Sequence, residues 1–186
     1  MNMFELYGPC DLFIEKLKDQ RIIRDDIFWP RHKKLHDCIG CYIFALSLPK
    51  KPKVVPRYSD PKKFITYDYK PYLVGSSTKN FRHDCFKKQD LKYYHEILPK
   101  GGIRKPVMFF LIHPQKNPDE TVLKEIDELK VFLINTGRVI NFSVRDVDDD
   151  SPSWGIKGVI RKDRSPGGAK AVRVFKNMMG FDKVKK

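Results

Sequence analysis

Short apolar runs alternate with polar and proline-rich stretches along the chain, a pattern typical of a mixed α/β domain. Residues 40–46 are dense in β-forming side chains and predict a buried strand, and shorter runs predict strands at 72–75 and 107–112. The stretch 48–70 holds four prolines among lysines. Because proline lacks a backbone donor, this stretch is expected to be a long loop or an edge hairpin.

Two helical stretches are expected within this part of the chain. The first begins near Asn80, whose side chain can cap it, and ends at the glycine pair 101–102. The second begins at Asp119 or Thr121 and ends at Gly137. Its apolar residues recur at helical spacing and form one stripe: Val122, Ile126, Leu129 and Leu133.

The C-terminal part has its own pattern. Residues 139–147 are expected to be extended, 148–152 to form an exposed turn, and 154–161 to form a strand. A glycine-rich turn at 165–168 leads into a last helix. Its apolar side consists of Ala169, Val172, Phe175 and Met179, and its basic side of Lys170, Arg173 and Lys176. This basic side is either a solvated surface or a phosphate contact, and the neighbouring Arg161 favours the contact.

The net charge of the chain indicates which kinds of partner it binds. With 37 Lys and Arg against 23 Asp and Glu, the net charge is +14, and such a surplus attracts phosphate polyanions. Nucleic acid is the expected partner, DNA more than RNA, although a basic protein without such a partner has the same composition. No apolar run approaches the length of a membrane span, and the N-terminus lacks the pattern of a secretory signal. An intracellular protein, cytoplasmic or in the nucleus or nucleoid, is therefore expected.

Histidine and cysteine residues, which are softer metal ligands, occur together between residues 32 and 41. His32, His36, Cys38 and Cys41 combine an i, i+4 histidine pair with a Cys-x-x-Cys, which is the ligand chemistry of a zinc site. Against this, only Asp37 separates the two pairs, and Cys41 lies in the expected strand, where alternate side chains point to opposite faces. Both a zinc site and ordinary buried histidines and thiols stay open on the sequence.

Several short motifs follow one another in order between residues 40 and 141. They are Gly40-Cys41-Tyr42, Leu73-Val74-Gly75 preceded by Tyr72, the loop 76–81, Leu133-Ile134, and Asn141. In residues and order they resemble the motifs of the GIY-YIG nuclease superfamily. The resemblance implies an α/β (α+β) fold with a small mixed or antiparallel three-stranded central sheet flanked by helices. It divides the chain into an N-terminal extension (1–39), a core (40–147) with the insert 48–70, and a basic C-terminal extension (148–186).

The resemblance also implies a type of chemistry. In an intact site of this family, a tyrosine activates water, an arginine stabilises the developing charge, and a glutamate holds one divalent ion, Mg²⁺ or Mn²⁺. Tyr42 and Tyr72 correspond to the tyrosines, and Asn141 corresponds to the asparagine that can donate to phosphate. The glutamate position is occupied by Lys130, which cannot bind a hard cation through oxygen.

The arginine position depends on the register. One alignment places Asp84 there, and another places His83 there with Arg82 beside it. Either the metal site has moved, with Glu128 or Glu125 as its carboxylate and Arg82 as its cation, or the fold is retained without cleavage. Glu128 lies two residues, or about 200° around a helix, from Lys130, and so faces away from the expected site.

The sequence therefore predicts a nucleic-acid-binding protein with altered or lost phosphodiester cleavage. The alternatives are an active DNA endonuclease that depends on a divalent metal, and a non-enzymatic protein that binds an acidic protein partner. The side chains expected to contact nucleic acid are Lys79, Lys87, Lys130, Arg161, Lys170, Arg173 and Lys176.

Overall fold

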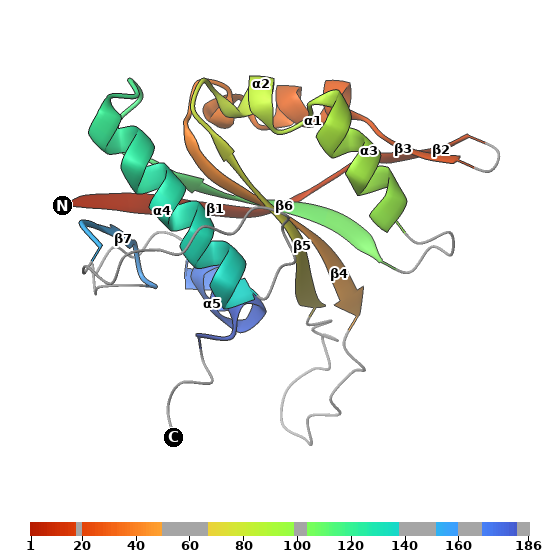
Figure 1. Ribbon diagram of the computed structural model, residues 1–186. Coiled ribbons are helices and arrows are strands. Elements are labelled where there is room, and N and C mark those ends of the chain that lie inside the picture. Colours follow the sequence, from red (N-terminus) through yellow and green to blue (C-terminus); the bar gives the residue numbers. More distant parts are fainter. Residues whose placement is uncertain (18–19, 50–66, 99–103, 138–151, 160–168, 182–186) are drawn as a thin grey trace, which may run out of the picture.

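The computed structural model describes residues 1–17, 20–49, 67–98, 104–137, 152–159 and 169–181. Its main sheet has the strand order β5-β4-β6-β1-β7 (Figure 1). The strands are β1 (Asn2–Asp11), β4 (Gly40–Pro49), β5 (Tyr67–Ser77), β6 (Lys105–Ile112) and β7 (Trp154–Ile156). All neighbours are antiparallel except β1 and β7, which are parallel. A separate hairpin joins β2 (Ile14–Leu17) and β3 (Gln20–Ile23).

Helices cover both faces of the sheet (Figure 1). On one face lie α1 (Asp25–Arg31), the short 3-10 helix η1 (Lys33–Leu35), α2 (Phe81–Asp84) and α3 (Lys88–Ile97). On the other face lie α4 (Glu120–Gly137) and α5 (Ala169–Met179). The chain is thus built in three layers with one apolar core on each side of the sheet. None of the described helices has the length and apolarity that a bilayer crossing demands.

The central strands are buried on both faces, which explains why they read as continuous apolar runs. On β4, Cys41 and Ile43 belong to the core under α4 and α5, whereas Tyr42 and Phe44 belong to the core under α1–α3. Residues on β6 alternate in the same way between the two cores. Gly40 opens β4 with φ of 141°, and a side chain there would overlap the backbone of β6.

The three expected strands are present as β4, β5 and β6, but the expected three-stranded sheet is not confirmed, because the main sheet has five strands. The segment 1–39 contributes β1, which pairs with β6, and β7 extends the sheet beyond β1. Along β1 the alternation of inward and outward side chains is interrupted, because the pairing of β1 with β6 shifts its register between Tyr7 and Cys10. The stretch 48–70 is strand at both ends, up to Pro49 and from Tyr67, and residues 50–66 lie outside the described part. Pro71 is tolerated in β5 because that strand is at the edge of the sheet, beside a bulge.

The expected helices are confirmed with changes at their ends. Asn80 caps α2 by accepting from the backbone N–H of His83 at 2.7 Å, but the helical stretch divides into α2 and α3. Asp119 caps α4 by accepting from the amide of Val122 at 2.8 Å. The four residues of the apolar stripe on α4 are each at most 1% exposed: Val122, Ile126, Leu129 and Leu133.

The C-terminal elements are partly as expected. The last helix is confirmed as α5, but β7 covers only 154–156, and its strand ends in a turn where Gly158 takes a φ of 73°. Residues 139–147 and 160–168 lie outside the described part of the chain.

Candidate functional site

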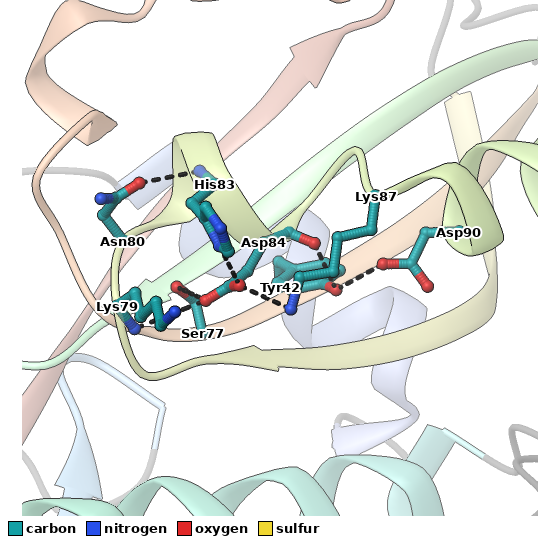
Figure 2. Close-up of polar contacts among 8 residues, drawn as sticks. All are labelled: Tyr42, Ser77, Lys79, Asn80, His83, Asp84, Lys87 and Asp90. Atoms are coloured by element: carbon teal, nitrogen blue, oxygen red, sulfur yellow. Dashed lines mark hydrogen bonds and ion pairs between the residues drawn. The ribbon is translucent and has the colours of Figure 1, made fainter.

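Tyr42 is placed by the pairing of β4 with β5. It stands opposite Gly75, and a side chain at that position would overlap the tyrosine ring. The phenol is 4% exposed and donates to Asp90 Oδ2 at 3.0 Å and more weakly to the backbone oxygen of Asp84 at 3.4 Å (Figure 2). Burial, followed by the charges of Cys85 and Asp90, raises the pKa of Tyr42 far above its usual value. Tyr42 is therefore a neutral hydrogen-bond donor at physiological pH.

Asp84 is the most densely bonded carboxylate of this region. Its side chain is 6% exposed and has four partners, which come from the end of β5, the loop before α2, α2 itself and the segment just after it. They are Ser77 Oγ at 2.9 Å, the Lys79 amide at 3.4 Å, His83 Nδ1 at 2.8 Å and Lys87 Nζ at 2.7 Å (Figure 2). Burial alone raises its pKa, but these donors outweigh burial and hold the pKa of Asp84 well below its usual value. Asp84 is thus a fixed anion around which the surrounding cations are held.

Two lysines and a histidine face outward around this carboxylate. His83 and Lys87 have side chains 53% and 54% exposed, and Lys79 is exposed as well. Because Asp84 is ionised, it accepts a hydrogen bond from Nδ1 of His83, which leaves Nε2 on the far side of the ring. Arg82 is exposed on the same short helix. The cations Lys79, Arg82 and Lys87, together with the neighbouring His83, are called the α2 cation cluster below.

Asp90 is the carboxylate that accepts a hydrogen bond from the Tyr42 phenol. Burial raises its pKa, and the Tyr42 hydroxyl and the charges of Lys87 and Lys130 oppose that rise. Lys130 lies on α4, on the other face of the sheet from Asp90 of α3.

Other expected site residues are not part of this cluster. Tyr72 sits at the bulge of β5, and its hydroxyl accepts from Arg104 at 3.2 Å instead of meeting Tyr42. Arg173 and Lys176 lie on α5, in the opposite layer from α2 (Figure 1). Asn141, Arg161 and the side chain of Lys170 fall outside the described part of the chain.

The two glutamates proposed as relocated metal ligands have other partners. Glu128 accepts from Trp154 Nε1 at 3.0 Å. Glu125 is 4% exposed and bonds to His113 Nε2 at 2.9 Å, Asn2 at 2.9 Å and Ser153 at 3.0 Å. Both side chains thus connect α4 to the β1–β7 side of the molecule and do not face Tyr42.

The four residues of the possible zinc site do not converge. Cys41 donates to the carbonyl of Ile126 under α4, whereas Cys38 donates to the carbonyl of Lys34 on the other face. His36 pairs with the carbonyl of Trp29, and His32 packs against Phe28. Within the described ranges no three His, Cys, Asp or Glu side chains form a group suited to a metal ion.

Asp90 and Ser77 were missed by the sequence analysis, and Asp84 was considered only as a substitute for arginine. The one local signal is the i, i+3 spacing of Asp84 and Lys87, which permits an ion pair on a helical turn. The contact between Tyr42 and Asp90 spans 48 residues and depends on the packing of α3 against β4. Such a contact has no signature in a single sequence.

Comparisons of the chain with family models, with curated proteins and with solved structures gave no match. The chemistry of the site therefore rests on its own geometry. Its carboxylates are turned inward and engaged, whereas its outward groups are cations and hydrogen-bond donors. Such groups suit the oxygens of a phosphate.

Proposed function

We propose that the protein binds nucleic acid through the α2 cation cluster, and that phosphodiester cleavage by its GIY-YIG-like core is altered or lost. One observation carries the proposal: the buried, ionised Asp84 holds His83, Lys87 and the Lys79 loop in place. Cations that are positioned before binding lose less conformational entropy when a phosphate arrives. The net charge of +14 supplies long-range attraction for the same partner.

The order of elements supports the resemblance. The hairpin β4–β5 is followed by α2 and α3, then by β6 beside β4, then by α4. Tyr42 stands on the first strand of this unit and Gly75 opposite it on the second. The altered chemistry is supported by the burial of the Tyr42 hydroxyl and by the lysine at position 130, whose charge acts on Asp90.

Binding is expected to weaken steeply with salt, because cations that meet phosphates release counterions. The double variant Lys79→Ala/Lys87→Ala is expected to lower the slope of log K against log salt by about 0.7–0.9 for each phosphate that the variant no longer neutralises. The measurement is fluorescence anisotropy with a labelled duplex and a labelled single strand at several salt concentrations. Lys124→Ala is the matched control, since that lysine is 78% exposed on α4 in the opposite layer.

An unchanged slope in the double variant contradicts the proposed surface. If the chain fails to bind either nucleic acid at low salt and instead co-purifies with an acidic protein, the alternative of a protein-binding function replaces the proposal.

Phosphodiester hydrolysis is the second candidate, favoured by the contact of the Tyr42 hydroxyl with Asp90. Under the main proposal, Tyr42→Phe is expected to leave nucleic-acid affinity unchanged and to lower the free energy of unfolding by about 1 kcal/mol, the net value of a typical hydrogen bond. Affinity is measured by anisotropy and stability by urea unfolding.

Plasmid and single-strand cleavage with Mg²⁺ or Mn²⁺ separates the two functions. Metal-dependent cutting that is lost in Tyr42→Phe makes hydrolysis the function, with Tyr42 as a catalytic residue. Asp90→Asn is the companion variant, because it removes the acceptor of the phenol while keeping a side chain of similar size.

A further inference from the structure

A pocket of about 480 Å³ opens beside the α2 cation cluster. One wall is formed by α1 and η1 and the other by Arg82 of α2. The two walls are held together, since the amide of Phe81 donates to the carbonyl of Cys38 at 2.9 Å. Trp29, one of the lining residues, makes edge contacts with Phe86 and His36, with ring centroids 5.5 and 5.6 Å apart. The volume is in the range of sites for one small molecule and too small for a duplex.

The lining combines three kinds of chemistry. Pro30 and Trp29, which is 5% exposed, provide apolar surface, Lys33 and Arg82 provide exposed cations, and two carboxylates come from the first turn of α1. Asp26 is engaged through both oxygens by Arg24, at 2.8 and 2.6 Å. Among the described residues, none forms a hydrogen bond or ion pair with the side chain of Asp25. The pocket therefore has one open carboxylate within a cationic rim.

A nucleotide unit matches this lining better than a simple anion does. Its phosphate suits Lys33 and Arg82, its flat base suits the apolar wall, and its N–H groups suit Asp25. Guanine carries two adjacent N–H donors on its pairing edge, so a single carboxylate can accept both. Adenine and cytosine present one amine beside an acceptor, and uracil and thymine present one N–H between two carbonyls. A paired base hides these donors, so the base must be unpaired.

We propose that this pocket binds an unpaired guanine of a nucleic-acid strand, with Asp25 accepting from the guanine edge and Arg82 and Lys33 contacting its phosphates. The inference rests on the proposed function, because Arg82 belongs to both the pocket and the α2 cation cluster. It adds a base preference, which the cation cluster cannot provide, since phosphates carry no sequence information.

The first test uses the fluorescence of Trp29 in the full chain. Trp154, the other of the two tryptophans, lies in the opposite core, so Trp154→Phe leaves Trp29 as the single reporter. GMP is expected to change the emission saturably, with an affinity at least about fivefold above that of AMP, CMP or UMP, the low end for a good bidentate contact. Asp25→Asn is expected to abolish this preference. Asp127→Asn, an exposed carboxylate on α4, is expected to keep it.

A second test avoids Trp154→Phe in case that variant does not fold. Labelled oligothymidine strands with and without one central dG are compared by anisotropy on the unaltered chain and on Asp25→Asn. Preference for the dG strand that disappears in Asp25→Asn supports the pocket. Equal, salt-sensitive binding of both strands overturns the pocket and leaves the proposed function standing. GMP binding without binding of either strand overturns both, because the site then serves a free nucleotide.

Discussion

Replacing Glu125 by alanine is expected to lower the free energy of unfolding by about 3 kcal/mol, because hydrogen bonds to an ionised group contribute about 1.5–3 kcal/mol and buried donors lose their acceptor. Glu125 and His113 have side chains 5% and 0% exposed, and their polar atoms lie 2.9 Å apart. The same carboxylate also accepts from Asn2 and Ser153, so the substitution leaves three donors without their acceptor. Urea unfolding at pH 7 measures the loss.

Glu128→Ala is the matched control on the same helix. Its side chain is 27% exposed and accepts from Trp154 Nε1, so about 1 kcal/mol is expected for its loss. A change of less than about 1 kcal/mol in Glu125→Ala contradicts the role assigned to this buried network. A double-mutant cycle with His113→Gln then isolates the coupling between the two residues.

The Glu125 network explains why the sheet was only partly predictable. Asn2 belongs to β1, His113 follows β6, and Ser153 precedes β7, so one carboxylate joins segments that are far apart in sequence. On the sequence, Glu125 was considered only as a relocated metal ligand. The strands β4 and β6 were predictable because they are buried on both faces and read as apolar runs, and part of β5 was predictable from its short apolar run at 72–75. β1 was not predicted as a strand, and the pairings of β1 with β6 and of β7 with β1 are long-range and are not encoded in a local pattern.

The candidate site was predictable to a similar extent. The motif around Tyr42 and the cap at Asn80 rely on local residue types, and the structure has the strand and the helix at those positions. The partners of Tyr42 and Asp84 depend on how the α2–α3 segment folds back onto β4, and only the three-dimensional arrangement supplies them. Lys130 was expected to replace a metal ligand, and its charge acts on Asp90 from α4.

Asp84→Asn is expected to lower the free energy of unfolding at pH 7 by about 1.5–3 kcal/mol, the range for hydrogen bonds to a charged group. The pKa of Asp84 is depressed in the folded state, so its stabilising effect is complete above the unfolded pKa of about 3.9. The effect is lost as the pH falls below that value towards the folded pKa. The difference between wild-type and Asp84→Asn stability, measured by urea unfolding from pH 7 to pH 2, is expected to shrink in this window. A constant difference contradicts an ionised Asp84.

Asp84→Asn also distinguishes binding by positioned cations from binding by net charge alone. Removing one negative charge raises the net charge from +14 to +15, so attraction by net charge alone predicts tighter binding. If Asp84 instead positions Lys87 and His83 for phosphate, Asp84→Asn is expected to bind nucleic acid several-fold more weakly, because these side chains must be ordered on binding. Asp37→Asn makes the same charge change at an exposed position and is expected to bind as tightly as wild type or tighter. Equal affinities in the two variants would show that the α2 cluster contributes charge without positioning.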